Sequence, residues 1–437
     1  MSVSNFRIKK VLPQLSLALF GLIITLRAFF PGLVTSDSLD QYQQATSFVF
    51  GDWHPPMMSF IWAITNDWIP GPFGMLLLDS ILYWGALLLL SLSIPKKNKY
   101  ISLLVVVTGF LPFTIGALSH IGKDVLHAVV WLFAIGVFCF FSSREDGSKK
   151  YLFLVAALLF IGNSLRFNAV FGLLPLIWLV LHKINIGASK KWVAIIFVLP
   201  VLALLLNAVF NYGFLKSAKS RVYQSLIVFD IGGISHFSGT DYFKEKWDGE
   251  QNNKIISSCY EPKAWDNYAW GDCSFVLKKL QDSGSWTNGS LMKKWISALM
   301  SEPTSYIKHR YGNYMEFLWH PNAVLDEQMV DNDYGFEYEM TSLFRILKLL
   351  TKPYEDTFIF KPGFWLFASL IFSVYGTIIR KNFSRDVFLA LNVSSFLYLL
   401  GYFIVGVASE FRYAYWSILA TTASIPFILL SIKTNKE

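Results

Sequence analysis

The sequence predicts an all-α membrane protein with about ten transmembrane helices, and three observations lead to this fold class. Of its 437 residues, 54% are hydrophobic and only 16% are charged, whereas roughly a quarter of the residues in soluble globular proteins are charged. The mean hydropathy is +0.44. Ten apolar runs are long enough, or nearly long enough, to cross a bilayer. This composition excludes a disordered chain, a disulfide-stapled small domain and an ordinary nucleic-acid binder.

The predicted spans begin close to the N-terminus. They cover residues 11–30, 71–94, 101–118, 125–141, 151–165, 169–182, 192–212, 363–379, 387–405 and 414–432. The two runs around Arg166 are short, so one broken helix is the alternative there. The first run ends at Phe29-Phe30-Pro31 without a small-residue cleavage site, and we expect it to stay as an anchor rather than to be removed as a signal peptide.

The distribution of Lys and Arg orients these spans, because short cytoplasmic connections are enriched in both. With the N-terminus in the cytoplasm, the inside connections carry Arg7, Lys9, Lys10, Lys96, Lys97, Lys99, Arg144, Lys149, Lys150, Lys183, Lys190, Lys191, Arg380, Lys381, Arg385, Lys433 and Lys436. The short outside connections carry only Lys123, Arg166 and Arg412. The net charge of +8 therefore indicates topology rather than nucleic-acid binding.

The first outside loop, residues 31–70, is predicted to hold two helices lying on the membrane. Residues 38–50 place apolar side chains on one face, and residues 55–69 are too short to span, begin with Pro-Pro and carry Trp anchors. Gly51-Asp52-Trp53-His54 joins the two helices. The loop belongs to an N-terminal transmembrane domain that we place at residues 1–212.

A polar region at residues 213–362 is predicted to form a mainly helical module outside the membrane, followed by C-terminal transmembrane helices at 363–437. Cys259 and Cys273 lie in this module, on the side where disulfides form, and a bridge or two thiols are both open. Cys139 lies alone in an apolar run, and no cysteine spacing indicates zinc.

The charges of the outside face indicate the chemistry. The first loop contains Asp37, Asp40, Asp52 and Asp67 but no Lys or Arg, while the short turns supply Lys123, Arg166 and Arg412. A carboxylate can take a proton from a sugar hydroxyl, and cations can neutralise a departing phosphate. This combination favours glycosyl transfer from a lipid phosphate sugar. The alternatives are that the cations anchor helix ends, that the acids cap a helix and that His54 closes a turn.

Two stretches of the first outside loop resemble a known family of enzymes. The stretch Asp37-Ser38-Leu39-Asp40-Gln41-Tyr42-Gln43-Gln44-Ala45, followed by Asp52-Trp53-His54-Pro55-Pro56, resembles the first outside loop of the multi-spanning GT-C glycosyltransferases. The length, the outside region between spans seven and eight and the Arg412-Tyr413 turn are similar to those of bacterial serotype-converting O-antigen glucosyltransferases. Many members have Asp-Glu in place of Asp37-Ser38, so the identity of the base stays open between Asp37 and Asp40.

The resemblance implies an inverting single displacement in which Asp37, or Asp40, deprotonates the acceptor. The donor would be undecaprenyl phosphate glucose and the acceptor lipid-linked O-antigen, on the periplasmic side of the inner membrane of a bacterium. The expected donor-phosphate ligands are Lys123, Arg166, Arg412 and His120. The expected substrate-binding residues are His54, Tyr42, Glu410, Trp265 and Trp270, with packing in the module core as the alternative for the two tryptophans.

No cofactor is expected, although a divalent metal held by Asp37, Asp40, Asp52 and His54 stays an alternative. Nor do we expect nucleic acid as a partner. Three rival functions remain. They are a transferase of the same fold for mannose, galactose or aminoarabinose, a flippase or transporter for a lipid-linked sugar, and a multi-span acyltransferase. A transporter would be expected to show internal repeats and charged mid-span residues, of which Asp79 is the clearest example.

Overall fold

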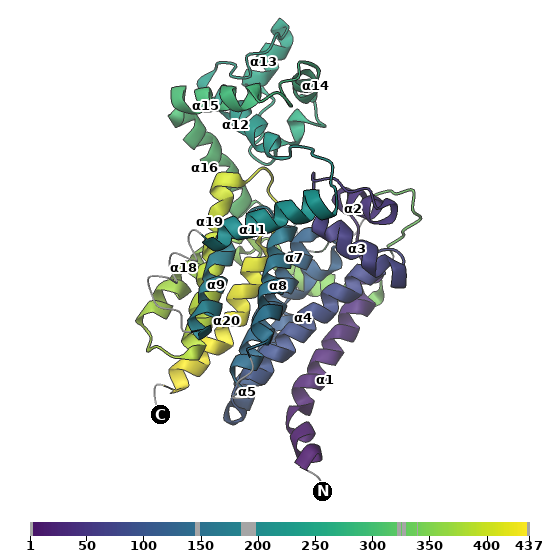
Figure 1. The fold of residues 1–437 in the computed structure, drawn as a ribbon, viewed down its shortest axis with the longest axis vertical. Helices are drawn as coiled ribbons and strands as arrows, with labels where there is room; N and C mark the ends of the chain where they lie inside the picture. Colours follow the sequence, from purple (N-terminus) through teal and green to yellow (C-terminus); the bar gives the residue numbers. More distant parts are fainter. Residues whose placement is uncertain are drawn as a thin grey trace.

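A bundle of long helices carries a smaller helical module at one end, and both chain termini lie at the other end (Figure 1). The computed structural model describes residues 3–144, 149–184, 198–320, 325, 329–338 and 340–434, with side chains from residue 11 to residue 433. Over these residues the regular structure is helical, and only three isolated β-bridges occur. The prediction of an all-α membrane protein is therefore confirmed.

Five described helices are long and apolar enough to cross a membrane. They are α1 (Val3–Phe29), α4 (Phe73–Ser93), α7 (Lys123–Ser142), α19 (Phe383–Val405) and α20 (Tyr415–Thr434). A pair of bent helices counts as a sixth span if the two are taken as one element. In this pair α5 (Lys99–Val107) with its 3-10 continuation meets α6 (Pro112–Ile115) at an angle of 62°. The bend falls at a proline, which cannot continue the preceding helix.

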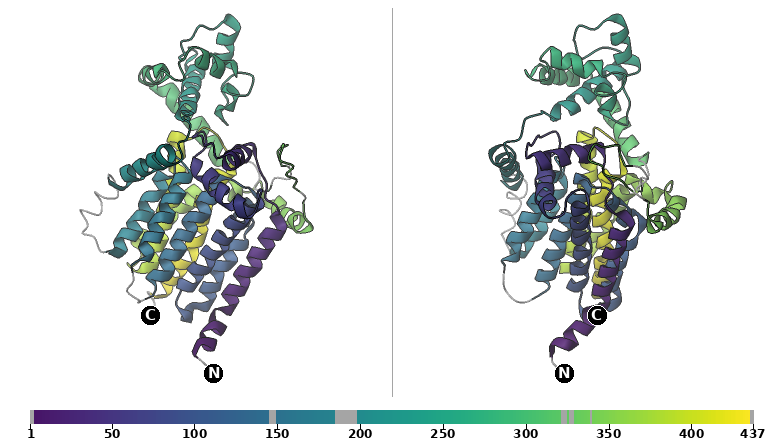
Figure 2. Two further views of the ribbon diagram at one scale, coloured as in Figure 1. Left: turned by 45° about the vertical axis from the view of Figure 1, so that its right-hand side comes forward. Right: turned by 90° about the vertical axis from the view of Figure 1, so that its right-hand side faces the viewer.

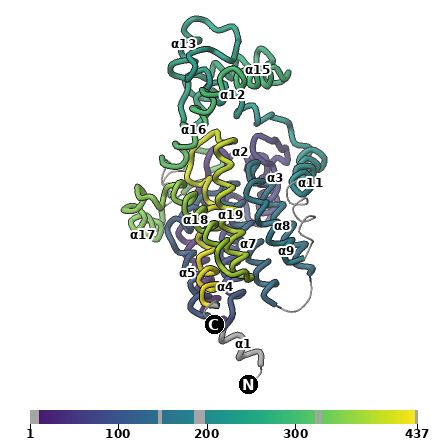
Figure 3. The backbone as a smooth tube through the Cα atoms, turned by 90° about the vertical axis from the view of Figure 1, so that its left-hand side faces the viewer, coloured from purple at the N-terminus to yellow at the C-terminus, as the bar shows by residue number. Residues whose placement is uncertain are grey.

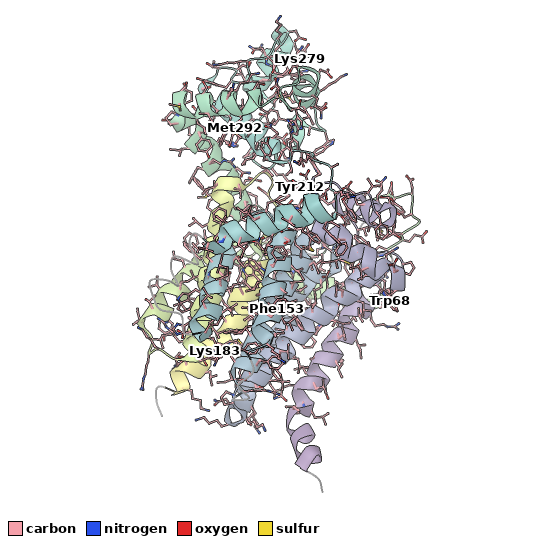
Figure 4. All side chains as sticks on the ribbon, in the orientation of Figure 1. Trp68, Phe153, Lys183, Tyr212, Lys279 and Met292 are labelled. Carbon is pink, nitrogen blue, oxygen red and sulfur yellow. A yellow bond between two sulfur atoms is a disulfide. The ribbon has the colours of Figure 1, made fainter. Side chains whose placement is uncertain are left out.

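Four shorter apolar helices complete the predicted set: α8 (Tyr151–Leu165), α9 (Val170–Ile184), α11 (Leu199–Ala208) with its π-helical continuation Val209–Phe214, and α18 (Pro362–Ile378). Helices α8 and α9 are separate elements on either side of Arg166, so each of the two short runs forms its own helix. Figure 4 places Lys183, on α9, toward the end of the bundle that holds the termini, and Tyr212 at the end below the module.

Helix α11 differs from the expected span. Its described part runs across the end of the bundle near the module rather than along the bundle (Figures 1 and 2). Apolar composition made this segment look like a span, but composition alone does not fix the direction of a helix, and these residues are shorter than the 20 or so that crossing requires. Residues 192–197, Lys190, Lys191 and Lys436 lie outside the described residues, as do the side chains of Arg7, Lys9 and Lys10.

Close backbone contact holds the centre of the bundle together. Gly136 of α7 packs against Ala86 of α4, where an added Cβ would lie 3.0 Å from the Ala86 carbonyl oxygen. Small residues at such crossings let two backbones approach, which is how helices associate where lipid supplies no hydrophobic drive. The α4–α7 pair thereby fixes the start of α7, which carries Lys123.

The two helices expected in the first outside loop are present as α2 (Ser36–Ser47) and α3 (Pro56–Trp68). Both lie at the end of the bundle nearest the module (Figures 1 and 2). Trp68, at the end of α3, is 84% exposed and projects from the side of the molecule in Figure 4. This position suits a tryptophan anchor at the membrane surface.

The module is built from α12 (Tyr223–Ser238), α13 (Gly249–Ser257), α14 (Phe275–Asp282), α15 (Ser290–Ser301) and α16 (Pro303–Trp319). It has its own hydrophobic cluster, separate from that of the bundle. Cys259 and Cys273 form a disulfide with 5.6 Å between their Cα atoms, which settles the question that the sequence left open. After the module, α17 (Ser342–Thr351) returns to the flank of the bundle (Figure 3) and packs on α1 through Phe344 and Phe29.

A buried ionic network joins the module to the bundle. Asp230 of α12 pairs with Arg310 of α16 and lies 3.1 Å from His309 Nε2, and Trp295 Nε1 donates to its second oxygen at 2.8 Å. Arg310 Nη1 also donates to the Gly406 carbonyl at 2.7 Å, just after α19. The network therefore fixes the module over the loop that leads to Arg412.

Candidate functional site

Short backbone bridges place Asp37 beside the start of α7. Leu33 pairs with His120 in a β-bridge, in which Leu33 N donates to the Ser119 carbonyl at 2.8 Å and Ile121 N donates to the Leu33 carbonyl at 2.9 Å. Gly32, with φ +107°, permits the turn into this bridge. The bridge thus places the start of α2 beside the start of α7, which carries Lys123.

The first turn of α2 then presents Asp37. Thr35 caps the helix in a capping box with Ser38, and the Ser38 hydroxyl also donates to the Ile121 carbonyl. Thr35 takes the capping role that the sequence also allowed for Asp37, so the Asp37 carboxylate is free to serve another purpose. Its side chain is 38% exposed.

Three groups surround the Asp37 carboxylate. Lys123 Nζ lies 3.1 Å from Oδ2, Arg412 Nη2 lies 3.7 Å from the same oxygen, and His54 Nε2 lies 3.6 Å from Oδ1. Lys123 Nζ is also 3.0 Å from His54 Nδ1. The structure therefore brings together the predicted base, two predicted phosphate ligands and His54.

Charge sets the protonation of this group. Burial opposes ionisation of Asp37, but the positive charges of Lys123 and Arg412 outweigh it and hold the pKa of Asp37 well below its usual range. Burial and the neighbouring Lys123 lower the pKa of His54 to about 3. At neutral pH the pair is thus a carboxylate and a neutral imidazole, whose Nδ1 can accept a hydrogen bond from Lys123.

Behind Asp37 lies a second set of ion pairs. Asp124, only 2% exposed, pairs with Arg166 and lies 3.7 Å from Arg412 Nε. Arg166 also donates to the Tyr402 hydroxyl. Arg412 Nε makes a close ion pair with Glu410. Asp124 therefore orients two of the three outside cations, a role that the sequence did not suggest.

Two cavities meet at Asp37. One, of about 830 Å³, extends from Asp37 past Asp40 and His120 toward the module residue Lys263. We name it the polar cavity. The other, of about 530 Å³, extends past Lys123 and Arg166, and we name it the cationic cavity. The two share the residues Asp37, Trp53, His54, Asp266, Trp270, Ala408, Glu410 and Arg412.

Asp40 faces the polar cavity, one helical turn after Asp37. Gln44 Nε2 donates to its Oδ2 at 2.8 Å, and burial together with the nearby Asp37 charge raises its pKa. His120 lies in the same cavity, with Nδ1 3.1 Å from the Ser119 hydroxyl. Lys123 and Arg166 line the cationic cavity, whereas Arg412 lines both cavities.

Tyr42 lies elsewhere. Its ring is buried among Trp62, Tyr334 and Phe336, with ring centroids 5.2, 4.9 and 5.0 Å away. It is absent from the residues that line either cavity. Tyr42 is close to the two acids in sequence. On α2, however, its side chain points away from the side that carries Asp40, and it packs in the aromatic cluster.

The disulfide-closed loop of the module reaches down to the site. Trp265 N donates to the Val407 carbonyl at 2.9 Å, and Trp265 and Trp270 both pack on Trp53. Trp265 is buried, whereas Trp270 is exposed and lines both cavities. Asp266, between them, has a pKa raised by burial and by the charges of Glu410 and Asp37.

Asp52 takes a structural place away from Asp37. Its Oδ2 accepts from the Tyr212 hydroxyl at 2.7 Å and its Oδ1 accepts from Ser220 N at 2.5 Å, so it ties the first loop to the segment after α11. Among the described residues, no group of three or more His, Cys, Asp and Glu side chains is arranged to hold a metal ion. The four-residue metal site weighed from the sequence is therefore not assembled.

Sequence reasoning gave no role to Trp53, Lys263 or Asp124 in the site. Trp53 was visible only as part of the connection between two helices, and Lys263 only as one charge in a mixed-charge module. Asp124, adjacent to Lys123, was the one with a local signal. An acid next to a membrane-embedded cation indicates a pair, but its partners Arg166 and Arg412 are distant in sequence.

The sequence matches no protein-family model, and no curated protein matches it. Among solved structures, archaeal oligosaccharyltransferase AglB from Archaeoglobus fulgidus, in complex with an inhibitory peptide and a dolichol-phosphate, is similar at 14% identity and a TM-score of 0.41, covering 97% of this chain and 50% of that one. The apo form matches at 14% identity and a TM-score of 0.41, covering 97% of this chain and 51% of that one. The chain spans about half the length of these structures, and the roles of its residues rest on its own geometry.

Proposed function

We propose that this protein is a membrane-embedded inverting glycosyltransferase of the GT-C type, which moves a sugar from a polyprenyl phosphate donor to a glycan acceptor. The observation that carries the proposal is the position of Asp37. Its half-exposed carboxylate lies where the two cavities meet and is held by Lys123 and Arg412. One carboxylate between a cationic cavity and a polar one suits a single displacement between two substrates.

The cationic cavity suits the donor. Lys123, Arg166 and Arg412 line it together with apolar side chains, among them Phe167, just before α9, and Phe171, in the first turn of α9. A polyprenyl phosphate has the same division, because its head is anionic and its chain is apolar. Arginine and lysine bind phosphate oxygens through charge-assisted hydrogen bonds. The apolar prenyl chain of the donor would remain in the bilayer.

The polar cavity suits the acceptor glycan. Asp40, Asp266 and Lys263 offer hydrogen-bond partners for hydroxyl groups, and Trp53 and Trp270 offer ring faces. Residues of α2 and of the module line this cavity, so we place the acceptor on the side of Asp37 that faces the module. The finer assignment, glucose moved to lipid-linked O-antigen at the periplasmic side of an inner membrane, is part of the proposal.

In the proposed reaction, the acceptor oxygen forms a bond to the anomeric carbon while the bond from that carbon to the donor phosphate oxygen breaks. Asp37 takes the acceptor proton, and polyprenyl phosphate leaves with its negative charge beside Lys123 and Arg412. The same two cations also lower the pKa of Asp37 and so reduce its basicity. A donor phosphate would neutralise them, so Asp37 would become a stronger base once the donor is bound.

The test is transfer itself. The chain is expressed in bacterial cells with and without enzymes that make undecaprenyl phosphate glucose, and the O-antigen repeat is analysed by mass spectrometry. We expect one added hexose only when both the donor and the wild-type chain are present. A repeat of unchanged mass in every combination would refute the glucosyl transfer, and addition of a different sugar mass would correct the donor while keeping the class.

A further inference from the structure

Each cation of the cationic cavity is paired with a carboxylate of the chain itself. Lys123 pairs with Asp37, and Arg166 pairs with Asp124. Arg412 faces three carboxylates from three parts of the chain, namely Asp37, Asp124 and Glu410. A phosphate group that arrives in the cationic cavity must therefore compete with carboxylates for these partners.

The three carboxylates around Arg412 are not equally easy to displace. Asp124 is 2% exposed and holds Arg166 as well. Asp37 is also held by Lys123, at the same oxygen that faces Arg412, and by His54 at its other oxygen. Glu410 is 41% exposed, its ion pair is with Arg412, and it lies in the loop between α19 and Phe411. Glu410 is thus the carboxylate that can leave at the least cost.

Glu410 binds one edge of the Arg412 guanidinium. Glu410 makes the close pair with Nε, which Asp124 also faces at 3.7 Å, and Asp37 Oδ2 lies 3.7 Å from Nη2. Glu410 is therefore the closest of the acids on the edge of the guanidinium formed by Nε and Nη2. That edge is a two-pronged donor that binds a carboxylate or a phosphate in the same way. Arg412 and Glu410 both line the cationic cavity and the polar cavity.

We propose that Glu410 is a placeholder anion that occupies the phosphate position on Arg412 and is displaced by the phosphate of the donor. This inference rests on the proposed function, because it assigns the donor phosphate to the cationic cavity. The displaced carboxylate has space in the polar cavity, which it already lines, on the side where the acceptor binds. The competition weakens binding of both donor and product, so the polyprenyl phosphate product is released when Glu410 returns to Arg412.

Binding of a product analogue tests this without any transfer step. Farnesyl phosphate is titrated into the purified full-length protein in detergent by isothermal titration calorimetry, with farnesol as the control that lacks the phosphate. Glu410→Gln removes the competing charge, and we expect it to bind farnesyl phosphate about tenfold more tightly than the wild type, a difference of about 1.4 kcal/mol. Farnesol binding should be unchanged.

Two further variants separate displacement from general charge. Asp266→Asn removes one negative charge from the same two cavities without touching Arg412, and we expect it to change the affinity by less than about twofold. Glu410→Asp keeps the charge but shortens the side chain away from Nε, so displacement predicts tighter binding and a pure charge effect predicts none. It also provides the test if Glu410→Gln does not fold.

The outcomes are distinct. Equal affinity of the wild type and both Glu410 variants overturns the inference and leaves the proposed function standing, and so does an equal gain in Glu410→Gln and Asp266→Asn. If the wild type and all variants bind farnesyl phosphate no better than farnesol, the cationic cavity is not a phosphate site. In that case the proposed function fails with the inference.

Discussion

Among the clusters of Asp, His and Arg that the described residues form, one in the module and one at the end of the bundle differ in their access to solvent. In the module, Asp230, His309 and Arg310 are almost completely buried, and Asp230 is 0% exposed. At the end of the bundle, Asp37 with His54 and Arg412 opens into two cavities. The chemical groups are alike, but one cluster is closed by protein on every side and the other is not.

The difference shows that access, rather than composition, separates a site from a structural joint. The carboxylate oxygens of Asp230 are bound by Trp295, His309 and Arg310 and are fully buried, so a substrate has no route to them. Asp37 is charged and held but still reachable. Substitutions in the two clusters should therefore have different effects.

Asp37→Asn removes the proposed base while keeping the size of the side chain. Because general base catalysis contributes typically 10²- to 10⁴-fold, we expect transfer to fall by about three orders of magnitude, as measured by hexose addition to the acceptor in isolated membranes. The protein should still insert and purify as the wild type does. Full activity of Asp37→Asn with loss in Asp40→Asn would move the base to Asp40.

Asp230→Asn should act on stability instead. It leaves Arg310 buried without its countercharge, and breaking a buried ion pair in this way costs about 3–5 kcal/mol. We expect a marked fall of the thermal unfolding midpoint in detergent, with the remaining folded protein still able to transfer sugar. A variant that keeps its unfolding midpoint but loses transfer would place Asp230 in the reaction and remove the contrast.

Lys123→Ala takes one cation from the cationic cavity. Charge-assisted hydrogen bonds to phosphate would be lost, so we expect the KM for the lipid donor to rise by about tenfold or more while the KM for the acceptor is unchanged. The matched control is Lys263→Ala, a cation that lines only the polar cavity. For Lys263→Ala the acceptor KM should rise instead, and equal effects of the two variants on the donor would contradict the assignment of the cavities.

The smallest effect concerns pH. Because the pKa of His54 is lowered to about 3, the neutral imidazole persists throughout the range from pH 5 to 8. An ordinary histidine with a pKa near 6.5 would instead become charged as the pH falls through that value. We therefore expect kcat/KM to vary by less than about twofold over this range owing to His54. An acidic limb near pH 6.5 that disappears in His54→Gln would show that the imidazole does titrate there.

Much of the fold followed from the sequence because the signals are local. Apolar runs, Pro-Pro at the start of α3 and the uneven spread of Lys and Arg each depend on neighbours along the chain. They correctly predicted the helices α2 and α3 and a mainly helical module. The direction of α11 was missed, because an apolar helix that crosses the end of a bundle has the same composition as one that spans a membrane.

For the site, local sequence was enough to show which charges are exceptional. Asp37, Lys123 and Arg412 stood out because charge is rare on the outside face, and the structure brings them together. The partners of these charges depend on the packing of the helices, because each contact joins segments far apart along the chain. Asp124 forms ion pairs with Arg166 and Arg412. Trp53 packs on Trp265 of the disulfide-closed loop, and Tyr42 packs on Trp62. Local sequence fixes where a helix begins and what charge it carries, whereas burial and pairing depend on how all helices pack at once.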